Sequence, residues 1–401
     1  MQASQLGSDH RRPHDRRLRV GIVVDGLVGR SSRDGRGDEV ANGGVGVYVD
    51  RLLRALAERD EVTVVPIRPG PLDLDLLCDP RFETVSDPLL RRLPRARFLD
   101  LRIAAISRRH ALDLVHYPNQ LGGAFLSRRI PRVATLHDLT PLSHPQHHPR
   151  ATVLGFRALL GRSVRRADRV IVPSEAVRAD LVRELPGFDR VTAVPLGVDE
   201  RFRPVAPSED LRRRLDLPER FLLSVGVLEP RKNHAAMVRA LAALHAAGER
   251  VSLVVVGRPG WRWVDPIEAT GLAELRPWVR ILRDLPTSDL VEIYGAAAAL
   301  VYPSFREGFG LPMLEAMACG CPVVASDRPA LPEVAGDAAL YASPDAPDEI
   351  AARVLEVLRH VAVRSRLVAR GLERSARFTW ERTADATVRV YAEVAGAQPR
   401  A

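Results

Sequence analysis

The stretch that decides the fold is Val301–Ser326, which reads Val-Tyr-Pro-Ser-Phe-Arg-Glu-Gly-Phe-Gly-Leu-Pro-Met-Leu-Glu-Ala-Met-Ala-Cys-Gly-Cys-Pro-Val-Val-Ala-Ser. Its apolar start predicts the end of a buried strand, and Gly308 and Gly310 free the backbone for a tight loop. Pro312 suits the first turn of a helix that we expect to end at Gly320, before a further strand. This order of elements predicts a parallel α/β sheet.

Two glutamates, Glu307 and Glu315, lie on either side of the predicted helix start. The free amides of that start, around Gly310 and Leu311, attract phosphate. One interpretation is that the carboxylates hold hydroxyl groups on either side of a bound diphosphate, as a nucleotide sugar requires. The other is that Glu307 is a loop charge and Glu315 a solvated helix residue.

The glycines, the proline and the Cys-Gly-Cys-Pro-Val-Val-Ala-Ser run around this pair extend the comparison. The segment closely resembles the E-x7-E motif of the retaining, GT-B-fold nucleotide-sugar glycosyltransferases of glycosyltransferase family 4. The resemblance runs from about Arg19 to Tyr391. It implies an α/β protein with two Rossmann-like parallel-sheet domains facing each other across a cleft. It also implies that Glu307 contacts the donor hexose and that Glu315 binds the ribose.

Length and composition agree with a two-domain protein. A chain of 401 residues suits two domains of about 200 residues each, and 46% hydrophobic residues suit a soluble globular protein. No apolar run approaches the roughly 20 residues that span a bilayer, and the polar, basic start predicts no signal peptide. The three cysteines form no even framework or zinc spacing, so we expect a cytoplasmic protein.

The expected domain boundaries follow from the composition and the resemblance. They are a disordered basic tail at 1–17, an N-terminal acceptor domain at 18–205, a linker at 206–218, a C-terminal donor domain at 219–379, and a helix at 380–397. By the resemblance, this last helix returns to the first domain from Trp380 onward.

The net charge of +9 allows nucleic acid, anionic lipid or an anionic small substrate as a partner. Nucleic acid is the weaker interpretation, because aromatic residues are only 5% of the chain and no nucleic-acid-binding motif accompanies the charge. Residues 89–111 predict an Arg-rich helix that either rests on the inner face of the membrane or is simply solvated. The sequence does not fix the oligomeric state.

A second candidate site is the turn Glu229-Pro230-Arg231-Lys232-Asn233, which follows a predicted strand. Two cations at the mouth of a helix form an anion site, and Asn233 is expected to cap the helix that follows. Lys232 is the only lysine, so 58 of the 59 basic Lys and Arg residues are arginine. One interpretation is that a compact ammonium is needed at a diphosphate, and the other is that the single lysine is due to chance. A pyridoxal Schiff base would also require lysine, but the surrounding residues resemble the turn of the transferases and not a cofactor site.

The family resemblance implies a donor site made of residues from the second domain. The expected donor-binding residues are Gly226, Arg231, Lys232, Asp284, Leu285, Glu307, Gly308, Phe309, Gly310, Leu311 and Glu315. Arg231 and Lys232 bind the diphosphate in this interpretation, and 283–285 pass the nucleobase. Together with His137, the residues Arg231, Lys232 and Glu307 form the expected catalytic set.

The first domain is expected to contribute two segments. His137 and Asp138 directly follow a predicted strand, at the edge where ligands of open sheets bind, and by the resemblance His137 reaches the sugar across the cleft. Gly43, Gly44 and Gly46 open a helix, and related enzymes place such a loop, facing the reaction centre, at this position. The prolines around His144, His147 and His148 predict an exposed loop rather than a metal site.

No metal and no cofactor are expected beyond the nucleotide sugar as co-substrate. Asp73-Leu74-Asp75 has the form of a metal-binding D-x-D motif, but it lies in a connector rich in proline, glycine and leucine and is interpreted as structural. The cations Arg231 and Lys232 are expected to hold the leaving diphosphate instead.

The predicted activity is that of a retaining hexosyltransferase. The turn and the central motif resemble those of bacterial mannosyltransferases, so the expected donor is GDP-mannose. The expected acceptor is a saccharide or lipid-linked saccharide of a cell-surface polysaccharide. A UDP-sugar enzyme acting on a secondary metabolite, a GT-B sugar-nucleotide epimerase and a noncatalytic basic binding protein are the alternatives.

Overall fold

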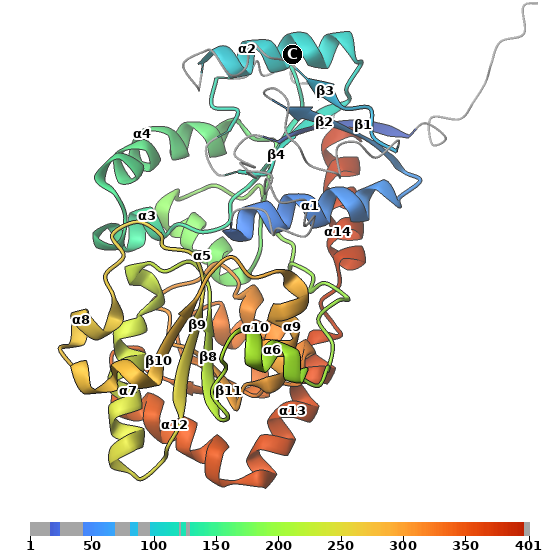
Figure 1. The fold of residues 1–401 in the computed structure, drawn as a ribbon. Helices are drawn as coiled ribbons and strands as arrows, with labels where there is room; N and C mark the ends of the chain where they lie inside the picture. The colour runs from blue at the N-terminus through green and yellow to red at the C-terminus, as the bar shows by residue number, and fades with distance from the viewer. Residues whose placement is uncertain are drawn as a thin grey trace, which may run out of the picture.

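The computed structural model describes residues 17–24, 43–68, 81–86, 97–119, 122–125 and 129–396. Within these ranges the chain forms two parallel sheets covered by helices, one in the upper and one in the lower half of Figure 1. Residues 1–16 of the predicted tail, the polar loop at 26–42 and Asp73-Leu74-Asp75 lie outside the described residues.

The first sheet is parallel, with strand order β3-β2-β1-β4-β5-β6-β7. Its strands are β1 (Leu18–Val23), β2 (Val62–Arg68), β3 (Val85–Ser86), β4 (Leu114–Tyr117), β5 (Arg132–Thr135), β6 (Arg169–Val172) and β7 (Val191–Ala193). Strands β4 and β5 are buried along their whole length, as expected where helices cover both faces of a sheet.

The second sheet is also parallel, with strand order β10-β9-β8-β11-β12-β13. Its strands are β8 (Phe221–Val225), β9 (Ser252–Val256), β10 (Val279–Leu282), β11 (Ala299–Tyr302), β12 (Val323–Ser326) and β13 (Ala339–Ala342). The order reverses direction between β8 and β11, which pair with each other. In open α/β sheets such a reversal marks the crevice where ligands bind.

Helices connect the strands in both domains. Those of the first domain are α1 (Gly43–Ala57), α2 (Arg97–Arg109), α3 (Thr140–Ser143), α4 (Arg150–Arg166) and α5 (Glu175–Glu184). Those that follow are α6 (Glu209–Arg214), α7 (His234–Ala246), α8 (Pro266–Thr270), α9 (Thr287–Ala296), α10 (Leu311–Ala318), α11 (Leu331–Ala335), α12 (Pro347–Arg359), α13 (Val361–Ser375) and α14 (Trp380–Gly396). In the part of the chain that the structure describes, no helix has the length and apolar content to cross a bilayer.

Two of these helices lie in segments predicted from the sequence, one as a linker and one as a basic helix. Helix α6 lies inside the stretch predicted as linker, and it packs on the second domain through the buried Leu211 and a two-bond contact from Arg214 to Asp289. Helix α2 covers the later part of the predicted basic helix and leaves Leu101 64% exposed. Its contact with a membrane stays a prediction.

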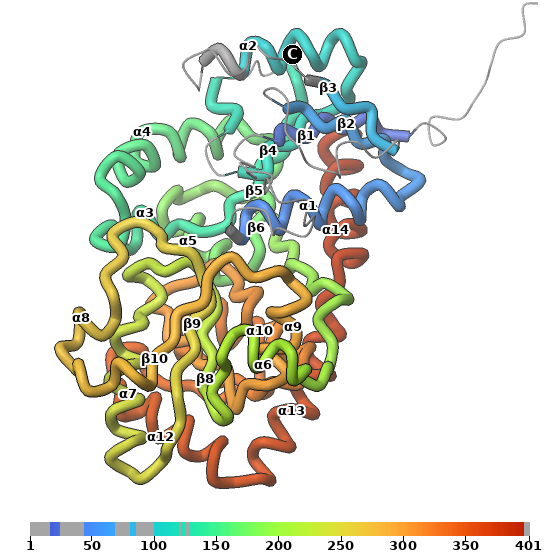
Figure 2. Tube along the Cα trace, viewed as in Figure 1, coloured from blue at the N-terminus to red at the C-terminus, as the bar shows by residue number. Residues whose placement is uncertain are grey.

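The C-terminal helix α14 returns to the first domain. In Figures 1 and 2 it runs from the second domain up to α1, against which it packs. The hydroxyl of Tyr391 lies 2.7 Å from Nδ1 of His116 in β4, and Arg59 pairs with Asp385 at 2.6 Å. The chain therefore connects the two domains both at the linker and at α14.

The facing edges of the two domains are in direct contact. A Cβ atom on Gly308 would lie 1.9 Å from the carbonyl oxygen of His137, and the hydroxyl of Ser174 donates to the carbonyl of Gly308 at 2.7 Å. The carboxylate of Glu333 accepts the backbone N–H groups of Glu175 and Ala176 at 2.7 and 2.9 Å. The loop after β11 and helix α11 thus rest on the start of α5.

Two local expectations are wrong. Asn233 precedes α7 but adopts a left-handed conformation, and its side chain makes no cap bond. It donates instead to the carbonyl of Pro344 at 2.7 Å, which ties the turn to the loop after β13. The segment with His144, His147 and His148 is no exposed loop: it follows α3 and includes the 3-10 turn Pro145–His147, and His148 is buried and stacked on Trp261.

We predict that Gly308→Ala separates the domains without unfolding either, because no side chain fits against the carbonyl of His137. Small-angle scattering should show a larger radius of gyration, with the unfolding midpoint within about 2 °C of the parent. Gly155→Ala is the control: it has open space in helix α4 and should stabilise by about 0.5–1 kcal/mol. Identical scattering of parent and Gly308→Ala would contradict the close approach.

Candidate active site

Three charged side chains of the second domain meet at the carboxyl ends of β8 and β11. Arg231 and Lys232 lie in the 3-10 turn Pro230–Lys232 after β8, and Glu307 lies in the loop after β11. Because β8 and β11 are adjacent and parallel, residues about 75 positions apart come to one edge of the sheet. The two motifs found in the sequence therefore form one site.

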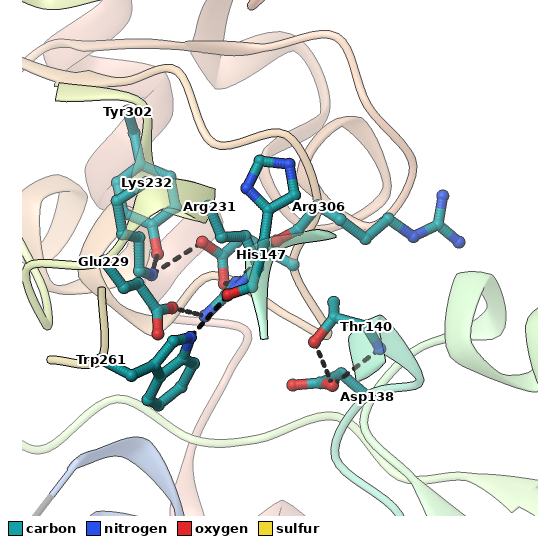
Figure 3. Close-up of polar contacts among 10 residues, drawn as sticks. Asp138, Thr140, His147, Glu229, Arg231, Lys232, Trp261, Tyr302 and Arg306 are labelled. Carbon is teal, nitrogen blue, oxygen red and sulfur yellow. Dashed lines mark hydrogen bonds and ion pairs between the residues drawn. The ribbon is translucent and has the colours of Figure 1, made fainter. Parts of the chain in front are cut away.

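The carboxylate of Glu307 is shared between the two cations, Arg231 and Lys232, whose side chains Figure 3 labels. Nζ of Lys232 donates to Oε1 at 2.7 Å, and Nη1 of Arg231 donates to Oε2 at 2.6 Å. Glu307 is 7% exposed and Lys232 is 8% exposed. Such short, charge-assisted bonds are among the strongest contacts in proteins.

Two members of this cluster were missed in the sequence. Glu229 accepts a bond from Nη2 of Arg231, and the hydroxyl of Tyr302 accepts from Nζ of Lys232 at 2.7 Å. Glu229 lies two residues before Arg231 in the same turn, so the sequence could have indicated that these two side chains meet. Tyr302 carried no such signal, because only the pairing of β11 with β8 brings it beside Lys232.

The electrostatics of the cluster favour an ionised Glu307. Burial raises the pKa of Glu307, but the charges of Arg231 and Lys232 outweigh it and bring the pKa to about 2. Burial lowers the pKa of Lys232, against the opposing effect of Glu307, and burial raises the pKa of Glu229. The formal charges of the two cations and two carboxylates cancel.

The backbone beside the cluster includes two glycines with positive φ. Gly310 has φ 102° and precedes α10, whose first amides point away from the helix. Gly226 follows β8 with φ 146°, and a Cβ atom there would lie 3.2 Å from Cε of Lys232. Phe309 is buried and packs on Phe378, while Leu311 is half-buried at the helix start. The predicted positions around the α10 start thus lie next to the cations.

Glu315 lies one turn into α10, where the hydroxyl of Tyr294 donates to Oε2 at 2.8 Å. Burial raises the pKa of Glu315 to about 7, with Asp199 adding to the effect and the bond from Tyr294 opposing it. The interpretation of Glu315 as a solvated helix residue is therefore wrong. Tyr294, in α9, is a neighbour that the sequence analysis did not find.

Asp284 and Leu285 lie after β10, which is separated from β8 by β9. At the usual spacing between strands, the end of β10 lies about 10 Å from the end of β8, where the charge cluster is. Asp284 has φ 53° and pairs with Arg258, and Leu285 packs against the core. A role of this segment at a nucleobase stays a prediction.

The first domain brings His137 to the same edge. Its Nε2 donates to the carbonyl of Pro118 at 2.9 Å, and burial lowers its pKa, so the ring is neutral at pH 7 with Nδ1 unprotonated. Asp138 is held by Thr140, whose amide and hydroxyl donate to Oδ1 at 2.9 and 2.7 Å. Figure 3 places Asp138 and Thr140 opposite the Arg231 cluster.

The glycines predicted at the first domain's loop open α1, which begins at Gly43. Gly44 is exposed with open space around it, and Gly46 is buried. A role in holding phosphate or acceptor stays a prediction. Among the described residues, no group of three or more His, Cys, Asp or Glu side chains is arranged to hold a metal ion.

A buried hydrogen-bond chain supports His137 from behind. The hydroxyl of Tyr48 lies 2.9 Å from Oγ1 of Thr135, which lies 2.8 Å from Nε2 of His116, whose Nδ1 meets Tyr391. The ring of Tyr48 packs edge-on against His137 at 4.8 Å. Tyr391 belongs to α14, so the returning helix supplies the last member of this hydrogen-bond chain. The spacing of these residues in the sequence did not indicate that they form hydrogen bonds with one another.

The two parallel sheets, facing each other through their edges, and the charge cluster at that junction define the class of GT-B glycosyltransferases. Family models agree: "Glycosyltransferase Family 4" matches residues 42–202, and "Glycosyl transferases group 1" matches residues 208–374. The chain belongs to this glycosyltransferase family and is a hexosyltransferase.

Individual relatives cover nearly the whole chain. The O-antigen chain mannosyltransferase B of Escherichia coli is 33% identical over 87% of this chain and 95% of its own length. The D-inositol 3-phosphate glycosyltransferase of Salinispora tropica is 31% identical over 88% of this chain and 81% of its own length. Sucrose-phosphate synthase from Thermosynechococcus elongatus, 24% identical, matches the fold with a TM-score of 0.75 over 95% of this chain and 100% of its own. The GT-B fold expected from the sequence is confirmed.

We predict that Lys232→Arg folds but loses activity. The ammonium fits between Glu307 and Tyr302 and lies 4.8 Å above the ring of Tyr302, where a planar guanidinium is too large. The expected fall in kcat/KM is about 10- to 100-fold. Arg370→Lys, the reverse exchange on the surface, is the control. Activity of Lys232→Arg within about twofold of the parent would show that only the charge matters.

We predict that nucleotide affinity rises with pH through about 7, the pKa to which burial raises Glu315. Above this pH the group is a carboxylate, which accepts ribose hydroxyls more strongly than the neutral acid. Calorimetry should show about fivefold tighter binding at pH 8 than at pH 6. In Glu315→Gln the same titration should be flat. A parent curve with no step near pH 7 would argue against Glu315 at the ribose.

Proposed function

We propose that this enzyme transfers mannose, with retention, from GDP-mannose to a saccharide acceptor of a cell-surface polysaccharide. Two findings support the sugar and the product class. The relative that spans 87% of this chain is an O-antigen chain mannosyltransferase, and a second relative, over 63% of the chain, is a serotype-specific mannosyltransferase. The site supports a nucleotide sugar as the donor, because it combines cations and helix amides, which suit a diphosphate, with a carboxylate, which suits sugar hydroxyls.

The observation that carries the proposal is the carboxylate of Glu307 shared between Arg231 and Lys232. A diphosphate carries more charge than one carboxylate and attracts both cations more strongly. Donor binding therefore transfers Arg231 and Lys232 from Glu307 to the diphosphate, which the amides at the start of α10 also contact. As the glycosidic bond breaks, these donors stabilise the charge that develops on the leaving group.

The same exchange frees Glu307 for the sugar. Its two oxygens, released from the cations, accept hydroxyl groups of the hexose and fix the ring. His137 approaches from the first domain, since its carbonyl lies against Gly308, the residue after Glu307. As the bond from the anomeric carbon to the diphosphate oxygen breaks, the acceptor hydroxyl attacks that carbon from the same face and gives its proton to the departing diphosphate oxygen, so the configuration is retained.

The test is a donor-by-acceptor screen with labelled nucleotide sugars. We expect transfer from GDP-mannose to mannose-containing saccharides, and no change of donor without acceptor. Transfer from UDP-sugars to small aglycones would favour a secondary-metabolite enzyme, and a donor epimerised without acceptor would favour an epimerase. If the protein binds nucleotide but turns over no donor, it is a binding protein and the proposal is wrong.

A further inference from the structure

The loop after β9, residues 257–264, is anchored beside the charge cluster. The N–H of Gly260 donates to the carbonyl of Leu228 at 2.8 Å, and the N–H of Leu228 donates to the carbonyl of Arg258 at 2.8 Å. A Cβ atom on Gly260 would lie 3.5 Å from Cβ of Glu229. Because Glu229 begins the turn that contains Arg231 and accepts a bond from it, the base of this loop is fixed to the donor side of the site.

The tip of the same loop contacts the first domain. Nε1 of Trp261 donates to the carbonyl of His147 at 2.6 Å, which Figure 3 shows, and Nη1 of Arg262 donates to the carbonyl of Gln146 at 2.9 Å. The indole ring also stacks on the ring of His148, with the ring centroids 5.4 Å apart at 30°. We call these five residues the clasp, because they connect the loop of one domain to the 3-10 turn of the other.

The clasp is a contact that can open. Arg262 has φ 54°, a left-handed conformation that residues other than glycine rarely adopt and that persists where neighbouring groups hold it. Its side chain is exposed, so the bond to Gln146 rather than core packing fixes it. Closing the clasp also buries Nε2 of His148, which has no hydrogen-bond partner among the described residues, and this opposes the closed form.

The closed clasp lies over the cations of the donor site. Burial lowers the pKa of His147 and of His148, and the positive charge of Arg231 adds to both effects, so the turn and Arg231 are close neighbours. With the clasp closed, the side chain of Arg231 is 11% exposed and that of Glu229 is 1% exposed. Trp261 itself is 38% exposed and is the outer member of this arrangement. Little water therefore reaches the groups proposed to hold the diphosphate.

Water at this position would compete with the acceptor. In hydrolysis the oxygen of water forms a bond to the anomeric carbon, the bond from that carbon to the diphosphate oxygen breaks, and a proton of the water passes to the departing oxygen. The products are the free sugar and the nucleoside diphosphate, and the donor is lost. An active site that excludes water prevents such side reactions and strengthens the electrostatic contacts inside it.

We propose that Trp261 and Arg262 determine the choice between the acceptor hydroxyl and water, because they hold the turn at 146–148 closed over the donor site. They are positioning residues, since they act through this turn. The inference rests on the proposed function and adds to it the element that keeps transfer ahead of hydrolysis.

Two variants in the full-length protein open the clasp without touching the charge cluster. Trp261→Phe keeps an aromatic ring for His148 and removes the N–H donor to His147. Arg262→Asn removes the guanidinium, and asparagine tolerates the left-handed backbone. Trp263→Phe is the matched control, because Trp263 lies in the same loop but packs against the core of the second domain, with Arg283 5.6 Å above its ring.

The assay measures both fates of a labelled donor. GDP-mannose and, in parallel, UDP-glucose are incubated with a mannose disaccharide, and free sugar and extended saccharide are counted. We expect the ratio of hydrolysis to transfer to rise about five- to tenfold in both clasp variants, as for the loss of one hydrogen bond, with the Kd of GDP unchanged and the control like the parent. A ratio within about twofold of the parent in both clasp variants, including an equal fall of both reactions, would overturn the inference.

Hydrogen exchange separates this inference from the proposed function, because it needs no turnover. The backbone N–H groups of His147 and His148 donate to the carbonyls of His144 and Pro145, so opening of the clasp should expose them. We expect peptides that cover 145–148 to exchange about fivefold faster in both clasp variants and at the parental rate in Trp263→Phe. If neither donor is turned over but this pattern holds, the proposed function is wrong and the clasp stands. If transfer occurs and exchange is unchanged in both clasp variants, the clasp is wrong and the function stands.

Discussion

The buried carboxylate of Glu307, held by Arg231 and Lys232, is the contact on which the site depends. It joins the loops after β8 and β11 and fixes the position of both. Removing one partner of such a buried pair costs about 3–5 kcal/mol, because the other charge is left uncompensated. A ligand with a stronger negative charge avoids this cost by replacing one partner with another. In the function proposed above, the resting contact is also the contact that donor binding rearranges.

The approach of the two domains is the second constraint. Gly308 packs directly against the carbonyl of His137, with no space for a side chain between them. Backbone contact therefore holds the loop that contains Glu307 against the segment of the first domain that contains His137. Behind His137, the chain from Tyr48 to Tyr391 links the first sheet to α14. The returning helix thus has a structural connection to the site as well as to the core.

Much of the fold and the centre of the site were predictable from local sequence. The Val301–Ser326 stretch contains its own strand, loop glycines and helix start, and the structure has β11, α10 and β12 there. Glu307, Arg231 and Lys232 were identified because each stands in a short motif at a strand end. Asn233 was misassigned as a cap, since its left-handed backbone and its bond to Pro344 depend on the distant loop after β13.

The sequence by itself determined the alternation of strands and helices, the family, and the charged residues of the two motifs. These are encoded over a few neighbouring positions by periodicity, glycine and proline placement and charge. Only the tertiary structure decided which of them meet. The pairing of β8 with β11 placed Tyr302 beside Lys232, burial gave Glu315 a pKa near 7, and the contact of the domains buried His148 against Trp261. Such features depend on distances between residues far apart in the chain, and no local pattern records those distances.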